Sequence, residues 1–138
     1  MNILGKFSLF TRTYRFFYIE GYEDIRNIIE CALEADENYN LLLVGPPASS
    51  KTFFLMGILD IRKDAVYFDG SNTTNRILDV LEQERPKIIL IDEIDKMGKS
   101  LQNQLLNFME SGRVKVVQQK KSYDFTINGA TPGCSKCN

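Results

Sequence analysis

Short apolar runs alternate along the chain with segments in which apolar residues recur at helical spacing. A continuous apolar run is typical of a buried parallel strand, and a spacing of three or four residues is typical of a helix with one buried face. Strands that alternate with helices predict an α/β fold with three layers around a parallel sheet. The predicted strands are 41–44, 65–68 and 87–91, and the predicted helices are about 22–36, 53–61, 73–83 and 100–110.

The pattern changes after Gly112, which stands where the last of these helices is expected to end. Two groups of apolar and aromatic residues, 114–117 and 123–127, flank the polar stretch 118–122. This arrangement predicts a β-hairpin at about 113–127. Residues 1–18 are rich in aromatic side chains without a clear period, and we interpret them as an N-terminal arm, either packed or poorly ordered.

Length and composition indicate one ordinary globular domain. The chain has 138 residues, of which 43% are hydrophobic and 25% charged. The formal net charge of -1 neither supports nor excludes a nucleic-acid partner, so any basic surface must be local. The sequence contains no histidine, which excludes imidazole as a base or metal ligand.

The three cysteines do not form a disulfide framework, which predicts a reducing, cytoplasmic setting. No signal peptide or membrane-spanning stretch is recognisable, so we expect no membrane partner. Cys134 and Cys137 form one C-x-x-C pair, which is half of a zinc site, and Cys31 is distant. We therefore expect neither zinc nor redox chemistry.

A phosphate-binding loop follows the first predicted strand. Backbone N–H groups of such a loop and of the helix behind it surround phosphate oxygens. The lysine reaches the β- and γ-phosphates, and the following threonine hydroxyl ligates Mg²⁺. The segment reads Gly45-Pro46-Pro47-Ala48-Ser49-Ser50-Lys51-Thr52 and differs from G-x-x-x-x-G-K-[ST] at one position.

That position is Ser50, where the general pattern has its second glycine. Because this position enters the helix, where a small side chain other than glycine can adopt the backbone angles, we expect Ser50 to be tolerated. The alternative is that the segment is a turn that matches the pattern by coincidence. The strand predicted before it and the apolar helix predicted after it both argue against this alternative.

An acidic pair follows the strand predicted at 87–91. At the end of a parallel strand beside the loop, Asp92 is expected to hold Mg²⁺ through water. Glu93 is expected to orient and activate the attacking water. A solvated strand end is the alternative, but two motifs in the right order, about 40 residues apart, favour the catalytic interpretation.

With these motifs the chain resembles the AAA+ ATPases over residues 19–131, and more closely the small archaeal members. The resemblance rests on 21–25, 45–52 and 91–97; Asp92 to Met97 also looks like the minichromosome-maintenance helicases, and 125–131 like the Holliday-junction branch-migration motors. It implies ATP and Mg²⁺ as ligands, an oligomer or a complementing chain, and a core at 19–131 with an irregular tail at 132–138. Residues 19–25, with Tyr22, are implied to pack near the adenine, and Phe53 to join the loop in binding the nucleotide.

In some members of this family a hairpin insertion contacts DNA, and the hairpin at 113–127 is similar to it. Four basic side chains on it are candidate phosphate contacts: Arg113, Lys115, Lys120 and Lys121. A solvated basic hairpin without a partner is the alternative.

The sequence departs from the family after the hairpin. The family places there a strand that ends in a polar sensor residue, but Pro132 and Gly133 argue against a central strand. Thr131 and Asn138 are the nearby polar candidates. We therefore expect a gap beside the strands at 41–44 and 87–91, and a truncated, frameshifted or split AAA+ core.

Two functions follow from these observations. The first is Mg²⁺-dependent ATP hydrolysis in an assembly that remodels DNA or protein. The alternative is a nucleotide-binding module with negligible hydrolysis, because the sensor, the arginine finger and the lid have no counterpart in the sequence. A small-molecule P-loop kinase is a remote third.

Overall fold

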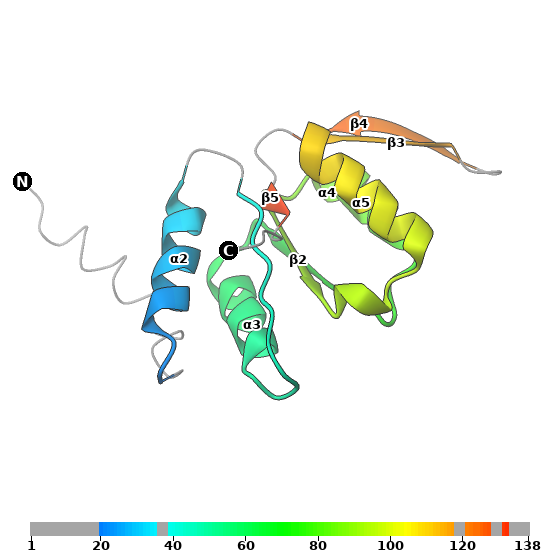
Figure 1. Ribbon diagram of the computed structural model, residues 1–138. Coiled ribbons are helices and arrows are strands. Elements are labelled where there is room, and N and C mark those ends of the chain that lie inside the picture. Colours follow the sequence, from blue (N-terminus) through cyan, green and yellow to red (C-terminus); the bar gives the residue numbers. More distant parts are fainter. Residues whose placement is uncertain (1–19, 36–38, 118–120, 128–130, 133–138) are drawn as a thin grey trace, which may run out of the picture.

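The computed structural model describes residues 20–35, 39–117, 121–127 and 131–132. The predicted helices are confirmed, with bounds shifted by up to three residues, and so are the strands expected at 65–68 and 87–91. In chain order the elements are α2 (Glu23–Glu34), α3 (Lys51–Ile61), β1 (Ala65–Asp69), α4 (Arg76–Glu84), β2 (Ile88–Asp92), the 3-10 turn η2 (Ile94–Lys96), α5 (Lys99–Ser111), β3 (Arg113–Val117), β4 (Ser122–Thr126) and β5 (Thr131–Pro132) (Figure 1).

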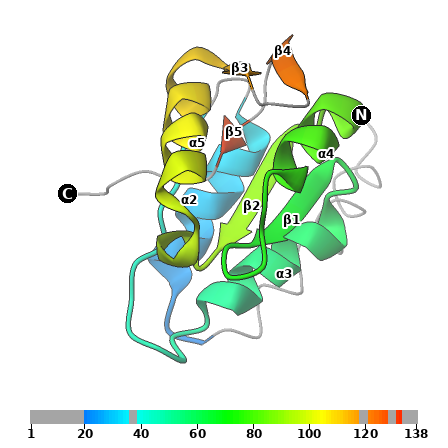
Figure 2. The ribbon, with the colours of Figure 1, turned by 90° about the vertical axis from the view of Figure 1, so that its right-hand side faces the viewer.

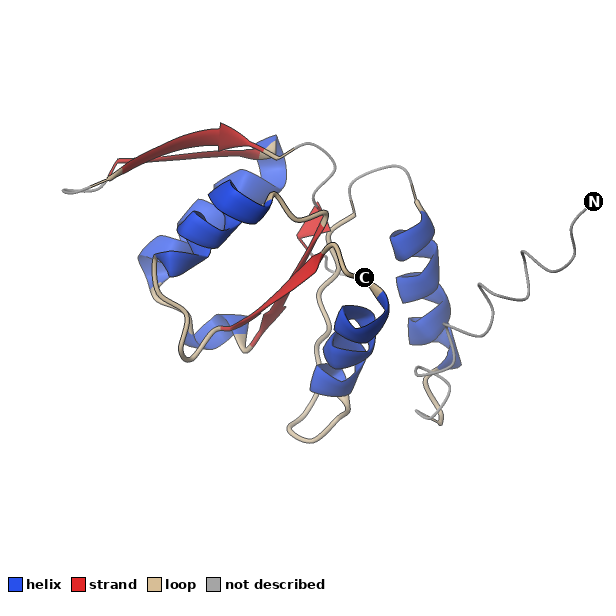
Figure 3. Ribbon diagram, turned by 180° about the vertical axis from the view of Figure 1, so that it is seen from behind, coloured by secondary structure: helices blue, strands red, loops and turns tan. Residues whose placement is uncertain are grey.

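The main sheet has the strand order β1-β2-β5, and both pairings are parallel. β1 and β2 run in register from Ala65 opposite Ile88 to Asp69 opposite Asp92. Helices lie on both sides of these strands (Figure 3). The expected three-layer α/β architecture is therefore present.

The two faces of β2 carry two different cores. Successive side chains of a strand point to opposite faces. Ile89 packs with α4, α5 and the hairpin, whereas Ile88 and Leu90 pack with α2 and α3. Because both faces are covered, the strand reads as a continuous apolar run rather than an alternating one.

The hairpin of β3 and β4 is confirmed, and it lies over the ends of α4 and α5 (Figure 2). Gly112, with φ 66°, caps α5 in the left-handed conformation and starts the hairpin. Val114, Tyr123 and Phe125 are buried against the two helices. The Tyr123 hydroxyl also donates a hydrogen bond to Asp79 on α4 at 2.9 Å.

The predicted strand at 41–44 is wrong. Residues 39–46 belong to no helix or strand, although Leu41 and Leu43 still pack beside α2 and α3. Val44 is 84% exposed. Within the described part of the chain, no strand pairs with this segment. Its apolar character therefore reflects partial burial rather than membership of the sheet.

The sequence argues against a central strand at Pro132, and the described sheet has a short edge strand there, where an irregular tail from residue 132 was expected. Thr131 and Pro132 form β5, which pairs with Ile88 and Ile89 of β2. A proline is tolerated at a sheet edge and at a strand end. Pro132 meets both conditions, because it is the last residue of β5 and β5 is an edge strand of the described sheet. The gap expected beside β2 is thus partly filled, over two residues of its length.

Candidate functional site

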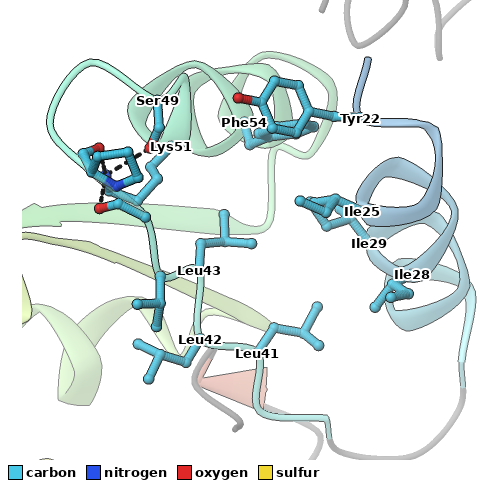
Figure 4. Close-up of a pocket in the computed structure, with 13 residues that line it drawn as sticks. Tyr22, Ile25, Ile28, Ile29, Leu41, Leu42, Leu43, Ser49, Lys51 and Phe54 are labelled. Carbon is cyan, nitrogen blue, oxygen red and sulfur yellow. Dashed lines mark hydrogen bonds between the residues drawn. The ribbon is translucent and has the colours of Figure 1, made fainter. Parts of the chain in front are cut away.

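The loop before α3 wraps around the ammonium group of Lys51. Its Nζ donates hydrogen bonds to the carbonyl oxygens of Gly45 and Pro46, at 2.9 and 2.7 Å, and to the Ser49 hydroxyl at 2.9 Å (Figure 4). An ammonium has three protons, so all its donors are used. The helix begins at Lys51, so the unpaired N–H groups of its first turn lie at the loop. Backbone N–H groups at a helix start can bind phosphate oxygens, and the dipole of the helix favours negative charge there.

Ser50 does not have the backbone angles of the helix that it enters, although those angles were the reason to expect that a serine is tolerated there. Ser50 has φ 63° and ψ 9°, in the left-handed region, and Ala48 has φ 61°. A side chain in this region costs about 1–2 kcal/mol because its Cβ crowds the backbone. The loop therefore keeps the backbone shape that glycine would adopt without strain, and Ser50 carries the strain instead.

Thr52 and Asp92 meet at the start of α3 and the end of β2. The Thr52 hydroxyl donates a hydrogen bond to Asp92 Oδ2 at 2.7 Å. A hydroxyl and a carboxylate are oxygen ligands of the kind that Mg²⁺ takes, and they converge here, so the pair fits the expected ion. Among the described residues, no group of three or more Cys, Asp or Glu side chains could hold a metal ion.

Two further donors hold the Asp92 carboxylate. The backbone N–H of Glu93 donates to Oδ1 at 3.0 Å, and the Tyr67 hydroxyl donates to Oδ2 at 3.2 Å. Burial, followed by the negative charge of Asp92, raises the pKa of Tyr67 to about 12. Sequence reasoning missed Tyr67, because a tyrosine in an apolar run is indistinguishable from an ordinary core residue.

Glu93 is held in an unusual backbone conformation beside Gly70. Its φ is 51°, and a Cβ on Gly70 would lie 2.2 Å from the Glu93 carbonyl oxygen. Only glycine permits this approach between the ends of β1 and β2. The Glu93 carboxylate forms an exposed ion pair with Lys96 at 2.8 Å, which raises the pKa of that lysine.

An apolar cavity of about 510 Å³ adjoins the loop (Figure 4). Its lining comes from three parts of the chain, namely α2 with the preceding Tyr22, the segment 41–46, and residues Ser49, Lys51 and Phe54. Tyr22 and Phe54 meet edge to face with their ring centroids 6.0 Å apart. Phe53, which we expected at the nucleotide, is 73% exposed and does not line the cavity, whereas Phe54 does. The spacing of Phe54 and Ile58 along one helix face could have identified it.

The hairpin side chains expected at DNA are largely paired within the protein. Arg113 forms a bidentate contact with Asp124, with both N–O distances 2.8 Å. Lys121 pairs with Asp79 and Glu82 on α4. Lys115 is exposed. Ile19, Lys120, Asn138, Cys134 and Cys137 lie outside the described residues.

The fold and this site define a P-loop-type α/β domain. A model of the ATPase family associated with various cellular activities (AAA) matches residues 41–132, and the chain belongs to this family. Membership implies an ATP-binding, ATPase-type function in general. No curated protein matches the chain. In the ranges that the structure describes, no helix is long and apolar enough to cross a membrane.

Replacing Ser50 by glycine tests the strain in the loop. We expect Ser50→Gly to raise the free energy of unfolding by about 0.5–1 kcal/mol, because the left-handed backbone costs glycine nothing. Ser49→Gly is the matched control and should be destabilising, since Ser49 accepts a hydrogen bond from Lys51 and its φ is not positive. Urea denaturation measures both, and a loss of stability in Ser50→Gly would contradict the strain.

Gly70→Ala tests the close approach to Glu93. The added methyl group must displace the Glu93 backbone, and we expect a loss of about 1–3 kcal/mol, as for other overpacked sites. Gly98→Ala is the control, because nothing lies within 4 Å of its Cβ position. Because Gly98 is the N-cap of α5, where alanine is disfavoured, this variant should lose at most about 0.5–1 kcal/mol of stability, less than Gly70→Ala. Equal denaturation midpoints for the two variants would show that the approach is not close.

Proposed function

We propose that this chain binds ATP together with Mg²⁺ and hydrolyses it. The observation that carries the proposal is the 2.7 Å hydrogen bond from Thr52 to Asp92, which joins the phosphate-binding loop to the acidic end of β2. Residues 40 positions apart in the chain thereby form one oxygen-lined site at the start of a helix. A solvated turn and a solvated strand end would not need to meet in this way.

Each side chain has a role that follows from its place. Lys51 exchanges its loop carbonyl partners for β- and γ-phosphate oxygens, while the N–H groups at the start of α3 bind the same phosphates. Thr52 and Asp92 hold Mg²⁺, Asp92 through water. The bound ion supplies positive charge against the phosphate oxygens. Glu93 accepts a hydrogen bond from the attacking water and orients it.

The cavity beside the loop is the proposed place of the base. Tyr22 and Phe54 offer apolar, aromatic surface there, next to Gly45 and Lys51. A flat aromatic base buries its faces well against such walls. The nucleotide-binding core that we propose spans residues 19–131, and α2 belongs to it because its Ile25, Ile28 and Ile29 line the cavity.

We further propose that the chain works in an assembly, with copies of itself or with a complementing chain, in a cytoplasmic setting. Frequent oligomerisation within the AAA family supports the first part. The likeness to small archaeal members and to helicases makes DNA a candidate substrate through the hairpin. Because Arg113 and Lys121 already pair with carboxylates, contacts from these two to DNA phosphates require an exchange of ion pairs, whereas Lys115 is exposed.

The alternative is a nucleotide-binding module with negligible hydrolysis. The observation on its side is the ion pair between Lys96 and Glu93, which must open before Glu93 can orient water. It is an exposed contact, of the kind that contributes about 0–1 kcal/mol. Turnover measured over a range of protein concentrations separates the two functions. A rate per chain that rises with concentration supports the assembled ATPase, and binding without turnover supports the module.

Lys51→Ala tests the phosphate loop. We expect it to abolish nucleotide binding in calorimetric titrations, because the only side-chain cation in the loop is removed. Lys63→Ala, an exposed lysine beyond the other end of α3, is the control and should bind as the parent does. If Lys51→Ala binds ATP as tightly as the parent, the assignment of the loop is wrong.

Glu93→Gln tests the role of the acidic pair. The amide keeps the shape but is a poor proton acceptor, so we expect unchanged ATP affinity and a turnover lower by about 10²–10⁴-fold. Phosphate release measures turnover, with Glu84→Gln on α4 as an exposed control. Full turnover in Glu93→Gln would remove Glu93 from the mechanism.

A further inference from the structure

The Asp92 carboxylate receives hydrogen bonds from three different parts of the fold. Thr52 on α3 and Tyr67 on β1 both donate to Oδ2, and the backbone N–H of Glu93 donates to Oδ1. Thr52 and Glu93 have roles of their own in the proposed reaction. Tyr67 is the remaining donor, and nothing in the phosphate loop or the acidic pair accounts for it.

The position of the Tyr67 hydroxyl is set by packing. Tyr67 lies opposite Leu90 in the parallel ladder, and Leu90 and Asp92 are two residues apart, so all three side chains leave the same face of the sheet. The Tyr67 ring packs against the core of α2 and α3, which includes Phe54, Ile58 and Leu90. This half-buried packing limits the positions of the ring and places its hydroxyl 3.2 Å from the carboxylate.

The phenol is also a dependable donor. A tyrosine hydroxyl keeps its proton near neutral pH, so it can donate to a carboxylate. With the proton on Tyr67, the contact at 3.2 Å is a hydrogen bond to a charged acceptor rather than a repulsion between anions. Thr52 and Tyr67 both donate hydrogen bonds to Oδ2. Two donors at one oxygen restrict the rotation of the carboxylate about the Cβ–Cγ bond of Asp92.

We propose that Tyr67 is a positioning residue that orients the Asp92 carboxylate for Mg²⁺. This inference deepens the proposed function and rests on it. Removing the hydroxyl leaves Thr52 and the Glu93 N–H in place but lets the carboxylate turn, so the ion binds less tightly. The phosphate loop does not depend on Tyr67, so nucleotide affinity without Mg²⁺ stays as it is.

Tyr67→Phe keeps the ring and removes only the hydroxyl. The measurement is ADP affinity as a function of Mg²⁺ concentration, and separately in EDTA, which reads binding rather than catalysis. We expect a rise of about 3–10-fold in the Mg²⁺ concentration that gives half of the full increase in ADP affinity. Groups that orient metal ligands usually have effects of about 10-fold or more, and the hydrogen bond from Tyr67 to Asp92 is long, so a smaller effect is expected. Affinity in EDTA should stay within about twofold, since the phosphate contacts are unchanged.

Tyr123→Phe is the matched control. Its hydroxyl also donates to an aspartate, Asp79, but at the hairpin and away from the loop. Both variants are checked by circular dichroism, and only Tyr67→Phe should change the Mg²⁺ dependence. Tyr67→Leu, a second variant without the hydroxyl, should show the same shift and serves if Tyr67→Phe does not fold.

Two results would overturn the proposal. One is a Mg²⁺ dependence in folded Tyr67→Phe equal to that of the parent. The other is an equal loss of ADP affinity with Mg²⁺ and in EDTA, which would make the hydroxyl merely structural. If the parent binds no nucleotide at any Mg²⁺ concentration, the proposed function itself fails and the inference fails with it, a result distinct from both.

Discussion

The burial of β2 on both faces is the constraint on which the rest of the structure depends. Ile89 is fully buried on one face, and Ile88 and Leu90 are buried on the other, so the strand requires helices on both sides. Its pairing with β1 brings Asp69 and Gly70 to the same end as Asp92 and Glu93. The acidic site is therefore a consequence of the core, because a parallel sheet collects the ends of its strands at one edge.

Backbone strain gathers at this edge. Three of the four non-glycine residues with positive φ in the described ranges belong to the loop or the acidic pair, namely Ala48, Ser50 and Glu93. Each costs about 1–3 kcal/mol and persists only where the surroundings enforce it. At Glu93 the enforcement is visible, because Gly70 allows the two strand ends to approach and its N–H donates to the Asp92 carbonyl at 2.8 Å. Because strained backbone persists only where its surroundings hold it, Asp92 and Glu93 are held in one arrangement.

Local patterns in the sequence were sufficient for the helices, for β1, β2 and the hairpin, because periodicity and caps such as Gly112 act within a few residues. They failed where the outcome depends on distant partners. The run at 41–44 has the composition of a strand but no described strand beside it, and Pro132 is accommodated because β5 is at an edge. The left-handed Ser50 was missed because the pattern shows which residue is replaced but not which backbone angles the loop imposes. Tyr67 was missed for a similar reason, since its hydroxyl acquires a role only when β1 lies beside β2.

Lys51 and Glu93 already have partners within the protein. The free energy of these interactions decides how strongly they compete with the proposed nucleotide. Lys51 is bonded to its own loop and Glu93 to Lys96, both at exposed or half-exposed positions. Exposed ion pairs, such as the one between Glu93 and Lys96, contribute about 0–1 kcal/mol, whereas micromolar binding corresponds to about 8 kcal/mol. Giving up this ion pair therefore subtracts little from the affinity for the proposed nucleotide, whereas Lys51 would exchange three hydrogen bonds for bonds to phosphate oxygens. For the same reason Lys96 alone cannot hold Glu93 permanently out of use. The orientation of Asp92 is better fixed, because Thr52, Tyr67 and the backbone N–H of Glu93 all donate to its carboxylate.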